Sequence, residues 1–187
     1  MAKGELLRDR TAAAIIDSAA SLLAQRGPAA SMEEIASGAG IGRATLYRYF
    51  PNREELLRAM AAASVQELAA RIEEANLEGV AVEEAIARLA RAIIATGSKY
   101  VALNGDSAKL ARTYPDFELR VTEPVRALFH RAVADGSLRE GWPADVLMDL
   151  FSGLITGALA ATARGQRGVE ESAAAVTTLF LDGARAA

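Results

Sequence analysis

The sequence predicts an all-α protein of about nine helices. Apolar residues recur three and four positions apart in nine segments, and no stretch has the period-two alternation of a half-buried strand. Hydrophobic residues make up 51% of the 187 residues and aromatic residues only 5%, a composition that favours helices packed on helices. The chain has no cysteine, which excludes a disulfide scaffold, a thiol nucleophile and the usual zinc-finger ligands.

The first two helices are predicted from their spacing and their ends. Apolar residues at helical spacing predict a helix over about 10–26, and a glycine-proline pair then stops it. Ser31 stands three residues before Glu34, the spacing of a capping box in which each side chain satisfies a free amide of the opening turn. A second, short helix is therefore expected over 31–37.

Glycines at 38, 40 and 42 separate this second helix from a third one, predicted over about 43–49. Asn52 then acts as an N-cap, with Glu55 at the third position, ahead of a long apolar pattern that ends near Asn76. The pattern predicts a long fourth helix. Later helical segments are expected near 82–96, 107–113, 116–135, 143–164 and 169–185. We expect two domains, residues 1–53 and 54–187, joined through the fourth helix.

Charge is distributed unevenly along the chain. The formal net charge is −3, but residues 1–53 hold seven Lys or Arg against five Asp or Glu. Between Glu34 and Glu54 the three arginines occur with no acidic residue at all. A short basic window on an acidic body is typical of a localised contact with an anion rather than of indiscriminate nucleic-acid binding.

The basic window coincides with the pattern of a helix-turn-helix. Ala36, Gly40 and Leu46 stand where such a motif needs a small residue, a residue free to take positive φ and an apolar anchor. The third helix would then present its outer side chains to the major groove of DNA. We expect residues 1–53 to be a three-helix DNA-binding domain.

The outer residues of this helix have chemistry suited to a duplex. Arg43 can fork onto a guanine edge, Ala44 can touch a thymine methyl, and Thr45 and the tyrosine hydroxyls can bond phosphates. Arg53, in the first turn of the fourth helix, is also suited to a phosphate. A basic surface helix is, however, often only a solvated face, and Tyr47 and Tyr49 can equally be packing residues.

The stretch from Ile15 to Leu57, with its SMEEIASGAGI and RATLYRYFPNREELL segments, resembles the tetracycline-repressor (TetR) family of transcriptional regulators. The resemblance covers about a quarter of the chain. It implies a homodimer and a larger helical C-terminal domain that binds a ligand and thereby alters DNA affinity. By position it implies base contacts from Arg43, Ala44 and Tyr47, phosphate contacts from Ser31, Met32, Thr45, Tyr49 and Arg53, and either role for Glu33 and Arg48.

The chain departs from the family pattern at three places. Gly42 stands where many relatives have a capping Ser or Thr, so a cap is missing from the third helix. Alanines at 12–14 replace polar or basic residues, and Pro28 replaces a common aromatic. The first two departures put contacts to the DNA backbone in doubt, and the third affects packing.

Two apolar segments near the C-terminus predict an interface. Their apolar faces are broad enough to need a partner, which the resemblance identifies as a second copy of the same helices. An intramolecular core explains the same pattern nearly as well. The candidate dimer residues are Leu150, Leu154, Gly157, Ala161, Val176, Leu179 and Phe180.

We expect a small-molecule effector, apolar or aromatic, to bind among the later helices, because few inward polar residues occur there. The candidate contacts are Tyr100, Asn104, Phe117, His130 and Trp142, each of which also fits ordinary packing. His130, the only histidine, has no acid or hydroxyl partner at a useful spacing and suits a structural role.

Other functions fit less well. An all-helical enzyme would have one histidine, no cysteine and no cluster of acids with metal-ligand spacing, so we expect no enzyme, no metal and no cofactor. A helical module that binds a partner or a small molecule without touching DNA remains the alternative. The longest uncharged apolar run, 150–163, is too short for a membrane span, and we expect a cytoplasmic protein.

Overall fold

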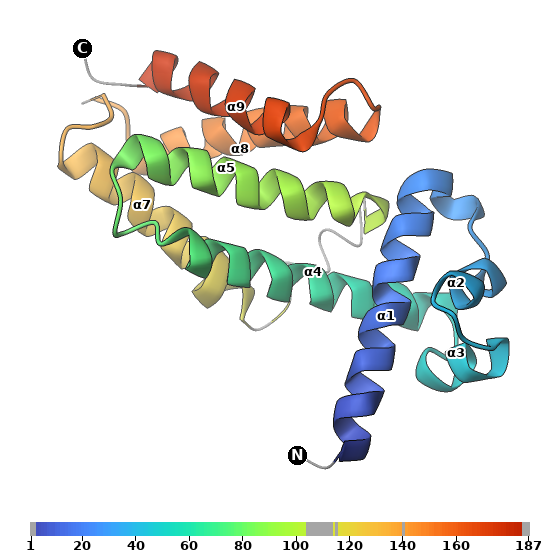
Figure 1. The fold of residues 1–187 in the computed structure, drawn as a ribbon. Helices are drawn as coiled ribbons and strands as arrows, with labels where there is room; N and C mark the ends of the chain where they lie inside the picture. The colour runs from blue at the N-terminus through green and yellow to red at the C-terminus, as the bar shows by residue number, and fades with distance from the viewer. Residues whose placement is uncertain (1–2, 104–113, 115, 140, 185–187) are drawn as a thin grey trace. The chain divides into compact units, whose positions relative to one another are not determined.

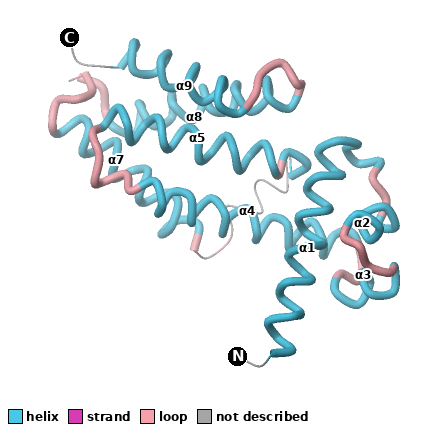
Figure 2. Tube along the Cα trace, viewed as in Figure 1, coloured by secondary structure: helices cyan, strands magenta, loops and turns pink. Residues whose placement is uncertain are grey.

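The computed structural model describes residues 3–103, 114, 116–139 and 141–184. Within these residues the chain forms eight α-helices and shorter 3₁₀ and π segments, and it forms no strand there (Figures 1 and 2). The predicted all-α fold is confirmed. The expected segment 107–113 and the candidate Asn104 lie outside the described residues.

The chain divides into two compact units. The first contains residues 1–64 and 99–111, and the second contains residues 65–98 and 112–187. The long helix α4, Arg53–Ala75, therefore contributes to both units, and the chain returns to the first unit at the end of α5, Val82–Lys99. The sequence-based division after residue 53 remains a prediction.

The first unit is built around α1, Lys3–Arg26, which begins earlier than its apolar pattern indicated. A 3₁₀ turn, η1, Gly27–Ala29, leads from it to α2, Met32–Gly38, and to α3, Arg43–Tyr49. Their inward residues, together with those of the first turns of α4, form a core that includes Ile15, Ala19, Leu23, Ile35, Leu46, Leu56 and Met60.

The segment after α5 also belongs to the first unit. Lys99 Nζ lies 3.0 Å from Asp17 Oδ1 on α1. The 3₁₀ turn η2, Val101–Leu103, packs against α1, and Tyr100 and Leu103 are buried. This return of the chain brings together residues more than eighty positions apart, and no sequence pattern predicted it.

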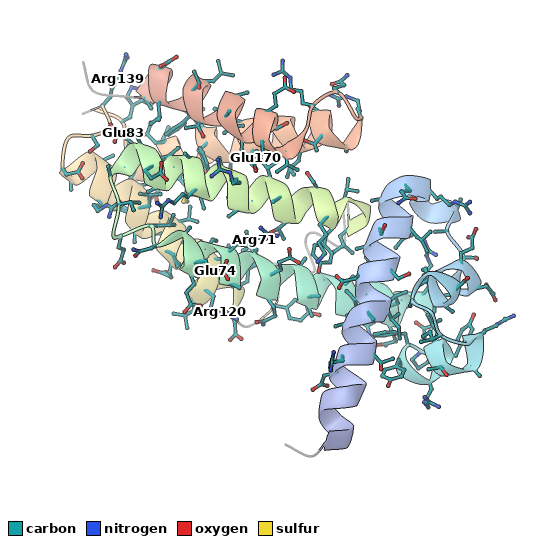
Figure 3. All side chains as sticks on the ribbon, in the orientation of Figure 1. Arg71, Glu74, Glu83, Arg120, Arg139 and Glu170 are labelled. Carbon is teal, nitrogen blue, oxygen red and sulfur yellow. The ribbon has the colours of Figure 1, made fainter. Side chains whose placement is uncertain are left out.

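The second unit packs α5 with α7, Glu123–Ala134, α8, Ala144–Ala163, and α9, Val169–Ala184. Phe129, Phe151 and Phe180 meet in its core with ring centroids 5.3 to 5.8 Å apart. Glu170 of α9 forms an ion pair of 2.8 Å with Arg91 of α5 (Figure 3). The three rings join α7, α8 and α9 around one apolar centre, and the ion pair joins α9 to α5.

The predicted helix over 116–135 is divided in the structure. A π segment, η3, Glu118–Thr122, precedes α7, and Pro124 stands in the first turn of α7. Because proline has no N–H and its ring displaces the preceding turn, the regular hydrogen-bond ladder cannot run through this point.

One helix of the described part, α8, is long and apolar enough by length and composition to cross a membrane. The expectation that this region is too short is therefore wrong as to length. Leu147, Phe151 and Ile155 of the helix are buried in the second unit at four-residue spacing. Such packing is typical of a helix in a folded domain.

Candidate nucleic-acid interface

The start of α2 is fixed by the predicted capping box. The amide of Glu34 donates to Ser31 Oγ at 3.2 Å, and the amide of Ser31 donates to Glu34 Oε2 at 2.9 Å. The backbone and hydroxyl hydrogen bonds from Ser31, with a further contribution from Arg26, hold the pKa of the Glu34 carboxyl below its ordinary value. Arg26 also bonds this carboxylate, which links the end of α1 to α2.

The turn between α2 and α3 has the predicted glycine geometry. Gly40 has φ +68°, in the left-handed region where a side chain is disfavoured. The amide of Ile41 donates to the carbonyl of Ala36 at 3.0 Å and so closes the turn over the buried alanine. The roles expected for Ala36, Gly40 and Leu46 are confirmed by these contacts, and Figure 1 shows the two short helices side by side.

Close packing of α1 against α2 supports this turn. A Cβ built on Gly38 would lie 2.6 Å from Ser18 Oγ and 3.3 Å from Leu22 Cδ1. Ser18 Oγ itself donates to the carbonyl of Ile35 at 3.0 Å. Gly38 was expected from the sequence only to end the second helix. Its lack of a side chain also allows α1 and α2 to approach closely.

The α3 helix has an inner and an outer face. Leu46 is fully buried and Phe50 is nearly so, while Arg43, Ala44 and Arg48 are exposed. Thr45, Tyr47 and Tyr49 are half-buried. The N-cap is Gly42, which supplies no side-chain bond, although its carbonyl accepts from the amides of Thr45 and Leu46. As the sequence indicated, α3 lacks a side-chain cap.

Arg43 occupies a defined position at the start of α3. Its Nη1 lies 3.0 Å from Glu33 Oε1, and its guanidinium lies 5.5 Å from the ring centroid of Tyr47. Its side chain remains 67% exposed, so a ligand can still reach it. Arg48 takes a similar position over Tyr49, at 5.8 Å. The exposed guanidinium groups therefore lie on aromatic surfaces of the same helix.

Three of the residues predicted to contact phosphates are hydrogen-bonded or buried within the chain. The hydroxyl of Ser31 takes part in the capping box, and Arg53 Nη1 donates to the carbonyl of Ala30 at 2.6 Å. The Met32 side chain is buried, with 8% of its surface exposed. A phosphate contact from Met32, which stays a prediction, would therefore use its backbone N–H.

The structure does not bring the candidate effector residues together. Tyr100 is buried in the first unit, whereas Phe117 is half-buried against the core of the second. His130 is exposed, and its Nε2 lies 3.7 Å from Asp145 Oδ1. The side chain is therefore not part of the buried core. Trp142 is 51% exposed.

The second unit has a groove of about 380 Å³ between α4 and the η3–α7 segment, and its walls include Ile72, Glu73, Leu77, Arg120 and Pro124. None of the candidate effector residues is among those that line it. Within the described residues no three His, Cys, Asp or Glu side chains gather as a metal site would require.

The predicted dimer face is partly corrected. Leu150 and Leu179 are exposed by 54% and 64%, and Gly157 is also exposed. Leu154 and Ala161 are half-buried. Val176 and Phe180, by contrast, pack in the unit's own core because their positions on α9 turn inward. A groove of about 320 Å³ on this face is lined by Trp142, Leu147, Leu150, Leu154, Leu179 and Phe180.

Comparison with known proteins agrees with this geometry. Residues 15–60 match the model of the family described as bacterial regulatory proteins, tetR family. The transcriptional repressor LfrR of Mycolicibacterium smegmatis is 50% identical over 54 residues, which are 29% of this chain and 28% of LfrR. The match thus spans about a quarter of the length of that curated relative.

Solved structures extend the likeness to the whole fold. The crystal structure of LfrR in complex with proflavine has a TM-score of 0.75 and 28% identity, and it covers 95% of this chain and 97% of LfrR. PfmR of Thermus thermophilus has a TM-score of 0.71 and 25% identity, with 90% and 97% covered. These are structures of TetR-type transcriptional regulators.

The first unit thus has the helix-turn-helix and the exposed basic face that are typical of a DNA-binding domain. Residues 15–60 match the TetR family, and over nearly the whole chain the fold is similar to that of TetR-type regulators. The relatives carry the names of regulators rather than enzymes, in line with the expectation from the sequence.

Proposed function

We propose that the protein is a repressor that binds a palindromic operator as a homodimer and is released by a small apolar or aromatic effector. The observation that carries this proposal is the outer face of α3. Arg43, Ala44 and Arg48 are exposed together on a helix whose angle is set by a buried anchor and a glycine turn. Such a helix has the size to enter the major groove.

Each outer residue has a role in this proposal. Arg43 forks onto a guanine, Ala44 contacts a thymine methyl, and the Tyr47 hydroxyl reaches a base edge. Thr45, Tyr49 and Arg48 hold phosphates and set the register of α3 on the duplex. Arg53 supports this arrangement from within the chain, because its bond to the carbonyl of Ala30 ties the first turn of α4 to the residue before the N-cap of α2.

The apolar surface of α8 and α9 supports the homodimer. Leu150 and Leu179 leave more than half of their surface in contact with solvent, and the exposed glycines of α8 allow a second helix to approach closely. Two copies related by a two-fold axis would carry two α3 helices, which would match two half-sites about 34 Å apart. The operator is palindromic for the same reason.

The proposal for the effector rests on the second unit and on a relative. The structure of LfrR with proflavine is that of a similar chain with a planar aromatic compound bound. We infer that an aromatic or apolar compound binds the second unit here and shifts the protein from a form that can bind DNA to a form that cannot. A regulator of this kind works in the cytoplasm, where its DNA lies.

Selection from random duplexes tests the DNA proposal. At a fixed, moderate salt concentration we expect enrichment of a partial palindrome. Arg43→Ala should lose about 1 to 3 kcal/mol of discrimination at one base position in each half-site. Arg71→Ala, an exposed arginine of α4 in the second unit that pairs with Glu67 on its own helix, serves as the matched control and should retain the preference.

Two results would redirect the proposal. Retention of no duplex above the nonspecific level would favour a helical module that binds a partner or a small molecule without DNA. A preference unchanged in Arg43→Ala would move the base contact to another residue. A thermal-shift screen of aromatic compounds, with proflavine included, followed by DNA binding in the presence of each hit, tests the effector separately.

A further inference from the structure

The contact between Glu33 and Arg43 joins the two helices of the helix-turn-helix. It joins the first turn of α2 to the first residue of α3, with Nη1 and Oε1 3.0 Å apart. The pairs of Arg58 with Glu54 and Glu55, by contrast, lie within one helix at three- and four-residue spacing. The contact thus engages the arginine that the proposed function assigns to a base.

Arg43 is restrained from two sides. The Glu33 carboxylate holds one terminal nitrogen, and the Tyr47 ring lies 5.5 Å from the guanidinium carbon. A guanidinium has five N–H donors in a planar fork, so an ion pair at Nη1 leaves the Nε and Nη2 edge for the two acceptors of a guanine. The two contacts orient the arginine without consuming the edge that reads a base.

Glu33 also changes the charge that Arg43 presents. Its side chain is 48% exposed, so the carboxylate lies at the surface beside the guanidinium. An arginine neutralised in this way gains less from a phosphate than an unpaired arginine does. A guanine edge is uncharged, so its hydrogen bonds to the guanidinium lose less.

We propose that Glu33 is a specificity-determining positioning residue, which holds Arg43 for a base edge and suppresses its pairing with phosphates. The inference rests on the proposed function, because it assumes that Arg43 reads a base. Glu33 acts through Arg43 and increases the ratio of operator binding to nonspecific binding. The favourable placement of an acid in the first turn of a helix is a second, purely local effect of the same residue.

The expected magnitude follows from counterion release. Each phosphate neutralised contributes about 0.9 to the slope of log K against log salt, so one added cation strengthens nonspecific binding by roughly three- to tenfold at low to moderate salt. Glu33→Gln should therefore bind random duplex about three- to tenfold more tightly and with a steeper salt slope. Discrimination at the base assigned to Arg43 should fall by about two- to fivefold, the scale of an exposed ion pair.

The experiment measures operator and random-duplex affinities of the full-length protein at several salt concentrations. The variants are Glu33→Gln, Arg43→Ala and the double variant, with Glu54→Gln as the control, because Glu54 is a first-turn acid of α4 whose side chain is 81% exposed. In the Arg43→Ala background, Glu33→Gln should no longer change discrimination. Thermal melting of each variant reports any purely structural loss.

The outcomes separate this inference from the proposed function. If the unaltered protein selects an operator and Glu33→Gln leaves the specificity ratio unchanged or raises it, the inference is wrong and the proposed function stands. An equal effect of Glu33→Gln with and without Arg43 also overturns it, since Glu33 would then act on DNA directly. If the unaltered protein shows no sequence preference, the proposed function itself fails.

Discussion

Replacing Gly38 by alanine tests the packing that sets the angle between α1 and the helix-turn-helix. The new Cβ would lie 2.6 Å from Ser18 Oγ, a distance that requires a shift of one group. Ser18 can shift only by weakening its 3.0 Å hydrogen bond to the carbonyl of Ile35. Overpacking of this kind costs about 1 to 3 kcal/mol, and the lost hydrogen bond contributes about 1 kcal/mol of that.

The double-mutant cycle with Ser18→Ala measures the clash directly. Ser18→Ala alone should cost about 1 kcal/mol, because it removes the hydroxyl that donates to Ile35. In the double variant the clashing oxygen is absent, and the Cβ of residue 18 lies 3.8 Å from the added Cβ, an ordinary contact. We expect the double variant to be more stable than Gly38→Ala, with a coupling of about 1 to 2 kcal/mol.

Hydrogen exchange of the α1 and α2 amides is the suitable assay, since it reports local opening of the first unit apart from the second. Affinity for a selected operator should fall with the same rank order, because α3 is carried by α2 through the glycine turn. A Gly38→Ala protein as protected as the unaltered one, with no gain in the double variant, would refute the reasoning.

Three further predictions follow from the structure. Gly157→Leu should leave the fold of the single chain intact, since a Cβ there meets no atom within 4 Å. The added side chain should weaken self-association about tenfold or more in sedimentation experiments. Unchanged self-association would mean that the interface lies on another face. Gly42→Ser should stabilise the first unit by a few tenths of a kcal/mol in urea titrations, because φ −73° and ψ 151° at this position suit a serine N-cap. A lower stability would mean that the serine hydroxyl does not reach the amides of α3. Glu34→Gln should be less stable than the unaltered protein at neutral pH, because the bonds from Ser31 favour the ionised form of Glu34. The difference in stability should narrow as the pH falls below the ordinary carboxyl pKa of about 4.3 and should be lost once the pH has passed through the lowered pKa of Glu34. A difference in stability that does not change between neutral pH and the acid limit of folding would contradict the assignment.

Local patterns predicted most of the helices. The capping box at Ser31, the N-cap at Asn52 and the positive φ at Gly40 are all present, because each depends on residues within a few positions. The division of 116–135 at Pro124 was missed, since apolar spacing continues across a proline that the hydrogen-bond ladder does not tolerate.

The parts of the candidate site that depend on distant contacts were not predictable. Glu33 and Arg43 are ten residues apart on different helices, and no periodicity relates them. The inward turn of Phe180 depends on its packing against Phe129 and Phe151, which come from two other helices. An apolar pattern indicates that a helix face is buried, but it does not show whether the same chain or a second copy packs against that face.

The division of the chain offers a route by which the ligand proposed for the second unit would influence α3 without touching it. The helix α4 is continuous from Arg53 to Ala75, and its first turns, through Ser64, belong to the first unit. The chain re-enters that unit at Lys99, whose ammonium group bonds Asp17 of α1. By this division the chain crosses between the units three times, after residues 64, 98 and 111. A displacement of the C-terminal half of α4 relative to α5 would therefore be resisted by the core of α1, α4 and η2 or would change that core. Because packed cores have few alternative arrangements, such a displacement shifts a population between discrete states rather than bending the unit gradually.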